Sequence, residues 1–475
     1  MISTQNNAQR LFIITALVFG LLYIFIVPPF QVPDEGHHLY RAYHIATGHV
    51  YGHRTIDYRF GGEMPSNLVE LEHGFRYLRY DYDARIDNNT WLTAAIIPLQ
   101  PEKTSFADFP NVAYYVPLPY LVQAIALRLG IVMELPPLFL LYVSRLAGFF
   151  FWVTLLYLAV RLIPFHKHTF AVIALLPSSL FINSGMTADS FTYGLCYLLF
   201  AFIMKLAYGK QEKTENSSLV SHKSWVLVLL MALSVTLSKV IYCPLLLLLL
   251  LIPANKFAHP WTKVRFIGSL FLINLLALFI MFHLMKDSFI SYENYHPDYR
   301  ENVQLNEGVH PTQQLDFVID NPGQFTKIAL RSHIAYLPAS VVHCVGKFGW
   351  EKNYLPFWIV GLLIIVLLAG GAMEQTPKNS VVTTPSSRLV FLAVIFSIVA
   401  VFTIVIYMQW SPVGNDTILS LGGRYYLPLL PLFFLVLKTD LLQVNQKLLR
   451  RMLWLCIWVG LTVGVYSVIG RYWMV

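Results

Sequence analysis

Long runs of apolar residues dominate the sequence and constrain its fold more than any other feature. Of the 475 residues, 56% are hydrophobic and 13% are charged, about half the charged share of a soluble domain. A run of about 20 apolar residues crosses a bilayer as a helix, which satisfies its own backbone hydrogen bonds. We therefore predict an all-α polytopic membrane protein of about 10–12 transmembrane helices, with residues 1–475 as one domain. The runs lie near 11–27, 113–131, 138–163, 170–182, 190–207, 225–237, 240–253, 266–285, 354–372, 389–408, 425–437 and 452–470.

The charged residues are distributed unevenly between the segments that join these runs. Segments 28–112 and 286–353 hold 19 of the 26 acidic residues but 13 of the 34 basic ones, so they carry a net charge of −6 and the rest of the chain +14. Basic residues concentrate in cytoplasmic loops. The two segments are therefore predicted to be extracytoplasmic loops. The overall charge of +8 follows from this topology, and we expect no nucleic acid partner.

The run at 113–131 is the one whose crossing is in doubt. If 28–112 is outside and the basic linker 161–167 is inside, only one of the runs 113–131 and 138–163 crosses completely. The first contains Pro117 and Pro119 and is barely long enough to span. We interpret it as a juxtamembrane or re-entrant helix.

Four charged residues lie at membrane depth, where charges are costly and usually functional or paired. Arg145 lies within a run, Asp189 precedes one, Lys239 separates two short runs and Arg424 precedes the run at 425–437. One interpretation is a structural pairing of Asp189 with a cation. Because the cations outnumber the acid, we favour a polar site with positive charge left for a phosphate, formed by Arg145, Lys239 and Arg424 with Asp189.

The opening of the first long loop carries the densest group of chemically active side chains. Pro28 and Pro29 end the first apolar run, so Asp34 and Glu35 lie just beyond the membrane surface, at the start of a helix predicted from Gly36 to Thr47. Asp34 as a simple helix cap is the alternative interpretation. The candidate substrate-binding residues here are His37, His38 and Arg41, and the aromatic candidates elsewhere are Tyr114, Trp350 and Tyr425.

A metal site is a weaker hypothesis for this loop. Its histidines follow no strong ligand spacing, so we predict no metal or other cofactor, although the sequence does not decide metal dependence. The histidines are His37, His38, His44, His49 and His53.

Six segments together resemble a known family, the predicted bacterial membrane proteins grouped as domain of unknown function 2142 (DUF2142). They occur in the same order and cover nearly the whole chain. The segments are Pro-Asp-Glu-Gly-His-His-Leu-Tyr-Arg-Ala-Tyr (33–43), Leu-Tyr-Val-Ser-Arg-Leu (141–146), Leu-Pro-Ser-Ser-Leu-Phe-Ile-Asn-Ser-Gly-Met-Thr-Ala-Asp-Ser (176–190), Leu-Ser-Lys-Val-Ile-Tyr (237–242), Phe-Gly-Trp-Glu (348–351) and Gly-Gly-Arg-Tyr-Tyr-Leu-Pro (422–428).

That family is similar in turn to the GT-C class of glycosyltransferases, which use polyprenyl-phosphate or polyprenyl-diphosphate sugars at the outer face of the membrane. The resemblance implies a GT-C-like helical bundle in which the acid of the first outer loop is the catalytic base. This acid corresponds to Asp34, with Glu35 as its neighbour. The stretch beginning at Tyr114 departs from the His-Pro-Pro-Leu of related transferases, because no histidine stands just before it.

The residues also suit this chemistry independently of the resemblance. A sugar hydroxyl needs a carboxylate base, and a phosphate leaving group needs positive charge but no general acid. We therefore predict an inverting glycosyltransferase in the bacterial inner membrane that moves a sugar from a polyprenyl-phosphate carrier to a cell-surface glycan or lipid, with its active site on the extracytoplasmic side. The alternatives are a flippase or transporter of lipid-linked sugars and a non-catalytic membrane scaffold.

Overall fold

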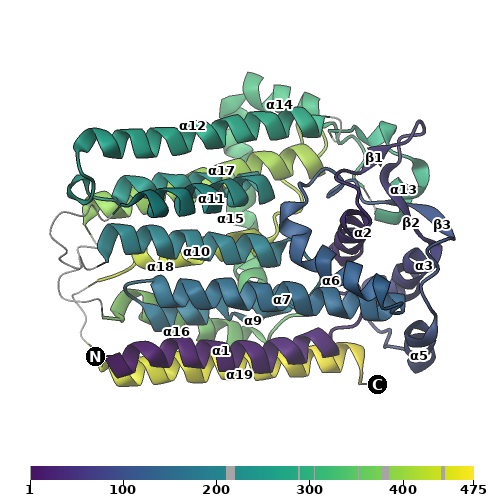
Figure 1. Cartoon of the computed structure of the whole chain (residues 1–475), viewed down its shortest axis with the longest axis horizontal. Coiled ribbons are helices and arrows are strands. Elements are labelled where there is room, and N and C mark those ends of the chain that lie inside the picture. Colours follow the sequence, from purple (N-terminus) through teal and green to yellow (C-terminus); the bar gives the residue numbers. More distant parts are fainter. Residues whose placement is uncertain are drawn as a thin grey trace.

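The computed structural model describes residues 2–209, 220–286, 289–303, 305–350, 352–375, 384–439 and 444–474. Long helices lie side by side in a bundle, and a smaller assembly of short helices and strands covers one end of it (Figure 1). The predicted all-α polytopic fold is thereby confirmed.

Seven helices in the described residues are long and apolar enough to cross a membrane. Each begins at or near a proline, a polar residue or a chain end, which are ordinary places for a helix to start. They are α1 (Ile2–Ile26), α7 (Pro137–Leu162), α10 (Asp189–Tyr208), α12 (Pro260–Met285), α15 (Pro322–Gly346), α17 (Pro385–Trp410) and α19 (Gln446–Tyr472).

Several other predicted crossings fall on shorter apolar helices that follow one another along the chain. Proline lies at two of the junctions: Pro177 is the first residue of α9, and Pro431 is the second residue of α18, which follows η6 directly. The short helices are α8 (Lys167–Ala174) with α9 (Pro177–Asn183), α11 (His222–Ser238) with η2 (Val240–Leu251), η6 (Gly423–Leu429) with α18 (Leu430–Val436), and α16 (Phe357–Met373).

The run at 113–131 forms only a short helix, as the charge argument predicts. It comprises η1 (Leu118–Tyr120) and α6 (Leu121–Val132). Twelve α-helical residues span about 18 Å, which is less than the roughly 30 Å hydrocarbon core. α6 packs against α7 and α2 at one end of the bundle (Figure 1).

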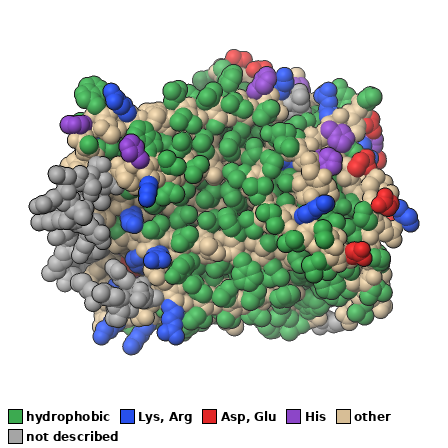
Figure 2. Space-filling model, in the orientation of Figure 1, with side chains coloured by type: hydrophobic (Ala, Val, Ile, Leu, Met, Phe, Trp, Pro, Cys, Tyr) green, Lys and Arg blue, Asp and Glu red, His purple; other side chains and the backbone are tan. Residues whose placement is uncertain are grey.

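The two ends of the molecule differ in charge. Figure 2 shows Lys and Arg side chains at both ends of this face, whereas the Asp and Glu side chains on it lie at the end opposite the N-terminus and over α14. Apolar side chains cover the surface between the two ends (Figure 2). We call these the basic end and the acidic end. Their separation agrees with the charge segregation read from the sequence.

The first long loop folds into a cap over the acidic end (Figure 1). Its three antiparallel strands are a local departure from the predicted all-helical fold, with Gly61 opposite Asp108 and Gly62 opposite Ala107. A side chain at Gly61 would collide with the Ala107 carbonyl oxygen, so this pairing needs glycine. The elements are α2 (Glu35–Ala46), β1 (His53–Arg54), β2 (Phe60–Pro65), α3 (Ser66–Phe75), α4 (Tyr77–Tyr80), α5 (Asn88–Ile96) and β3 (Thr104–Asp108).

The second predicted loop, 286–353, is not a loop throughout. It contains α13 (Pro297–Val303), α14 (Pro311–Asp320) and the 25-residue helix α15, which is among the candidate membrane spans. The sequence prediction missed α15 because its hydropathy, 1.2, is the lowest of the seven, and because it contains Lys327, Arg331 and Pro338. α15 follows α14 along the chain and packs against α9 and η6. In Figure 1 it lies behind the helices at the front of the view.

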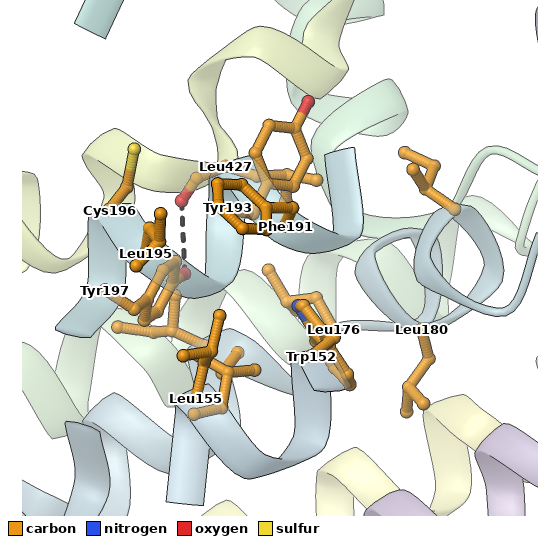
Figure 3. Close-up of a cluster of buried hydrophobic side chains, with 14 of the residues drawn as sticks. Trp152, Leu155, Leu176, Leu180, Phe191, Tyr193, Leu195, Cys196, Tyr197 and Leu427 are labelled. Carbon is orange, nitrogen blue, oxygen red and sulfur yellow. Dashed lines mark hydrogen bonds between the residues drawn. The ribbon is translucent and has the colours of Figure 1, made fainter. Parts of the chain in front are cut away.

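The core at the centre of the bundle joins α7, α9, α10 and η6. Figure 3 shows Trp152 and Leu155 of α7 packed near Leu176, Leu180 and the aromatic side chains of α10. The hydroxyl of Tyr197 donates a hydrogen bond to the Leu427 carbonyl oxygen, at 3.1 Å (Figure 3). These contacts fix α10 against η6, and with them the two charged residues at their acidic ends, Asp189 and Arg424.

Candidate functional site

The candidate base stands on a tight turn between α1 and α2. Prolines 28, 29 and 33 prevent α1 from continuing, and the chain turns back through Asp34, whose φ is +65°. Asp34 precedes α2 but its side chain makes no capping hydrogen bond, so the helix-cap interpretation is wrong. The carboxylate is instead directed to another element.

That element is η6. Arg424 Nη2 donates to Asp34 Oδ2 at 2.7 Å, and both side chains are 24% exposed. Burial alone would raise the pKa of Asp34, but the charge of Arg424 and the hydrogen bond from Arg424 outweigh it. The pKa of Asp34 therefore lies well below its usual range, and the carboxylate is ionised at neutral pH.

A second ion pair lies beside the first. Lys239, at the junction of α11 and η2, pairs with Asp189 at the start of α10, whose side chain is 2% exposed. The Lys239 ammonium also lies over the rings of Tyr193, at 5.7 Å, and Tyr425, at 5.2 Å. Tyr193 in turn donates to the Arg424 carbonyl oxygen at 3.0 Å, which links the two pairs through α10.

An apolar cavity of about 240 Å³ opens next to these pairs. Lys239 is the one charged side chain among the described residues that line it. Apolar residues come from the acidic ends of α12 and α17, and tyrosines come from the segment that precedes η1, from the second long loop and from η6. The main contributors are Leu278, Met281, Phe282, Val405, Ile406, Tyr114, Tyr115, Tyr292, Tyr295, Tyr299 and Tyr425.

The pairing of charges corrects one step of the sequence argument. The predicted surplus of cations over Asp189 does not exist, because Arg424 is neutralised by Asp34 and Lys239 by Asp189. The buried Asp189 contacts Lys239, so a direct role in substrate binding is replaced by one in holding that lysine. A phosphate would have to compete with these carboxylates for Lys239 and Arg424.

Glu35 and Arg145 form a separate, fully buried pair, which overturns their predicted roles. Both side chains are 0% exposed, and two hydrogen bonds of 2.6 and 2.7 Å join them. Glu35 also accepts from the backbone N–H groups of Phe30 and Met186, while Arg145 also donates to the carbonyl oxygens of Ile24, Val27 and Pro28. Neither group can reach a substrate; together they hold α1, α2 and α7 in register.

The three candidates on α2 lie close to Asp34 but differ in role. His38 is buried and shares a 2.7 Å hydrogen bond with the Tyr120 hydroxyl; burial lowers its pKa to about 4, so it is neutral at pH 7. Arg41 is wholly buried and binds the carbonyl oxygens of Val50 and Tyr115, which makes it a support for the loop and not a substrate ligand. His37 hydrogen-bonds Asn111, a residue of the cavity wall, at 2.8 Å.

The predicted aromatic residues divide between two places. Tyr114 and Tyr425 line the cavity, as expected for substrate contacts. Trp350 does not: its indole N–H donates to the Phe30 carbonyl oxygen at 3.2 Å in a separate recess. Glu351, the last residue of the Phe-Gly-Trp-Glu segment, lies outside the described residues.

Sequence reasoning missed most of the cavity wall. Tyr292, Tyr295 and Tyr299 belong to a polar loop, where the spacing of tyrosines was the one available signal. The histidines of the first loop do not assemble into a metal site, since within the described ranges no three His, Cys, Asp or Glu side chains lie close enough together to hold an ion.

The chain matches, over residues 17–433, the family described as predicted membrane protein (DUF2142). No curated protein and no solved structure gives a significant match. The match agrees with the resemblance read from the six segments, whereas the relationship to GT-C glycosyltransferases remains a hypothesis.

Proposed function

The chain belongs to the DUF2142 family of predicted membrane proteins, and we propose that it is an inverting glycosyltransferase of GT-C type that uses a polyprenyl-phosphate sugar. One observation carries the proposal: Lys239, the one charged side chain among the described residues that line the apolar cavity, lies over the same Tyr425 ring as Arg424, which pairs with the partly exposed carboxylate of Asp34. An isoprenoid tail suits the apolar wall, and a phosphate suits the cations.

The proposed reaction is a direct displacement. The acceptor hydroxyl oxygen attacks the anomeric carbon of the donor, its proton passes to the Asp34 carboxylate, and the bond from the anomeric carbon to the phosphate oxygen breaks. The electron pair of that bond stays on the polyprenyl phosphate. Lys239 and Arg424 stabilise this charge, which is worth more in a site that excludes water.

The ion pair between Asp34 and Arg424 suggests how binding of the donor would raise the basicity of Asp34. Arg424 now occupies one oxygen of Asp34 and keeps its pKa low, which makes the carboxylate a weak base. A donor phosphate that draws Arg424 away would raise the pKa of Asp34 at the moment a base is needed. Arginine suits this exchange because its planar group contacts two phosphate oxygens at once.

The arrangement favours transfer over transport. The described residues that line the cavity come from the acidic halves of their helices or from the loops there, whereas a flippase needs a path that reaches the basic end. Under the positive-inside rule the acidic end faces away from the cytoplasm, so the proposed site is extracytoplasmic in the bacterial inner membrane.

The test is a transfer assay with purified protein in detergent, where transport between compartments cannot produce a signal. Polyprenyl-phosphate hexoses and an extract of surface glycans are supplied, and release of polyprenyl phosphate is followed by mass spectrometry. We expect release that depends on the extract and that Asp34→Asn abolishes. Absence of release, together with unchanged surface-glycan masses in cells that lack the protein, would overturn the proposal.

A further inference from the structure

The helix α15 is long enough to span a membrane, yet both of its ends lie at the acidic end of the bundle. Near its start, the ring of Phe325 lies 5.6 Å from that of Tyr407, three residues before the end of α17. Just past its end, the ring of Phe348 lies 6.0 Å from that of Tyr23, three residues before the end of α1. Both α1 and α17 end at the acidic end (Figure 1). α15 therefore does not cross to the basic end.

Between these two points α15 passes close to η6. The Cys344 thiol donates to the Gly423 carbonyl oxygen at 2.8 Å, and a Cβ atom at Gly423 would lie 2.4 Å from that of His343. Figure 1 shows α15 running across the direction of the long helices, behind them. At 1.5 Å per residue its 25 residues extend about 37 Å. α15 thus lies across the bundle, in the plane of the membrane.

The contact with α17 sets the depth at which α15 begins. The 26 residues of α17 extend about 39 Å, whereas the hydrocarbon core is roughly 30 Å thick. Tyr407, one helical turn from the end of α17, is therefore near the boundary between hydrocarbon and lipid headgroups. The first half of α15, which starts beside Tyr407, lies near the same boundary.

The face of α15 that points away from the bundle is apolar and exposed. Ile328 and Ser332 are buried against the bundle. On the opposite side of the helix, Leu330, Ile334 and Leu337 are 59%, 72% and 59% exposed. At this depth an exposed apolar face contacts lipid chains.

Two cations lie on the same outward face. Lys327 and Arg331 are exposed, and because they are four residues apart they are neighbours on the helix surface. No ion pair formed by the described residues involves either side chain. Long basic side chains at this boundary keep their stems in apolar surroundings and extend their charges to the headgroups. Such charges attract anionic lipids.

We propose that the outward face of α15 binds an anionic phospholipid. Its phosphate lies between Lys327 and Arg331, and its acyl chains lie along the apolar side chains of that face. Charge favours this occupant: a zwitterionic lipid carries an ammonium group of its own, and a second copy of this chain, placed there by two-fold symmetry, would bring the same cations and no acid. None of the described residues that line the apolar cavity belongs to α15, so the inference does not depend on the proposed reaction.

Lipid binding is tested on the full chain in detergent, titrated with phosphatidylglycerol or phosphatidylcholine of identical acyl chains and followed by native mass spectrometry. We expect phosphatidylglycerol to bind more tightly. The double variant Lys327→Gln with Arg331→Gln should weaken its binding roughly 10–30-fold, because each cation near a membrane surface contributes about fivefold. Exchange of the two cations, Lys327→Arg with Arg331→Lys, should preserve binding. The matched control is Arg54→Gln with Lys103→Gln, which removes the same charge from exposed positions of the cap and should leave binding unchanged.

The position of α15 is tested separately by labelling. Lys352 is exposed and follows α15, so a cysteine there should react with an impermeant thiol reagent in intact cells. Reaction only after lysis would show that α15 crosses the membrane and would overturn the inference.

Three results of the titration would also overturn it. They are equal affinity for the two lipids, unchanged phosphatidylglycerol binding in the double glutamine variant, and a dimer that this variant dissociates while no lipid is bound, which would assign the face to a second copy. Unfolding temperatures of all variants separate lost binding from misfolding. Because both cations are exposed, we expect these temperatures to be unchanged in the absence of lipid.

Discussion

Asp34 Oδ2 and Arg424 Nη2 lie 2.7 Å apart although 390 positions separate the two residues in the sequence. Asp34 stands on the turn after the first helix, and Arg424 stands on η6, in the last pair of short helices. Their contact joins the first loop to η6 and places an ionised carboxylate against Arg424, whose neighbour Tyr425 lines the apolar cavity.

Asp34→Asn should lower sugar transfer at least about 100-fold, because an amide cannot accept the proton of the attacking hydroxyl. The fold should survive, since both partners of the pair are partly exposed. Initial rates of polyprenyl-phosphate release measure the effect, and Asp57→Asn, an exposed acid in the same loop, is the control. A variant that keeps more than a few per cent of the rate would show that the base is another group.

The fall of the transfer rate at low pH should depend on the Asp34–Arg424 ion pair. The pKa of Asp34 is held below its usual value by Arg424, so the carboxylate stays ionised, and the ion pair stays intact, until the pH falls through that low pKa. In Arg424→Gln the main charge that lowers the pKa is lost while burial still raises it. We expect the acid limb of the pH profile, or of polyprenyl-phosphate binding, to move to higher pH in this variant. An acid limb at the same pH in Arg424→Gln as in the unmodified protein would show that Arg424 does not set the pKa of Asp34.

The extent of agreement between sequence and structure differs between the bundle and the site. Apolar runs determine helices directly, because the bilayer permits no other form, and this is why α1, α7, α10 and α19 lie where predicted. Which charged residues pair depends on which helices pack next to one another. The identity of a single residue in the sequence does not reveal that packing. Arg145 and Arg424 are both single cations within or next to an apolar run of the sequence, yet Arg145 is fully buried with Glu35 whereas Arg424 is 24% exposed and pairs with Asp34.

Removal of one partner of the buried Glu35–Arg145 pair should destabilise the protein by about 3–5 kcal/mol, since the other charge is left unpaired without water. Arg145→Met is expected to lower the unfolding temperature of the purified protein sharply. Arg128→Gln, an exposed arginine on α6, serves as the control and should change it little. If Arg145→Met unfolded normally and lost only binding of polyprenyl phosphate, the donor role assigned from the sequence would be restored.

Both long loops should be accessible from outside the cell. Single cysteines at Asn88, on α5, and at Glu307, near α14, should react with an impermeant thiol reagent in intact cells, while one at Lys223, at the basic end of α11, should react only after lysis. Three of the native cysteines, Cys196, Cys344 and Cys456, are buried and should contribute little background. Labelling of Lys223→Cys in intact cells would invert the orientation.

The role of Lys239 can be separated from its pairing with Asp189. Lys239→Met leaves Asp189 buried without its partner, so we expect loss of stability as well as of polyprenyl-phosphate binding. In the double variant Lys239→Met with Asp189→Asn no charge is left unpaired there, so the unfolding temperature should recover. Binding should not recover, because Lys239 is the one charged side chain among the described residues that line the cavity, and it is absent from this variant. Thermal unfolding and titration with a synthetic polyprenyl phosphate measure the two quantities on the same samples. Recovery of both would mean that Lys239 serves only to neutralise Asp189, and the donor phosphate would then have to be held by Arg424 alone.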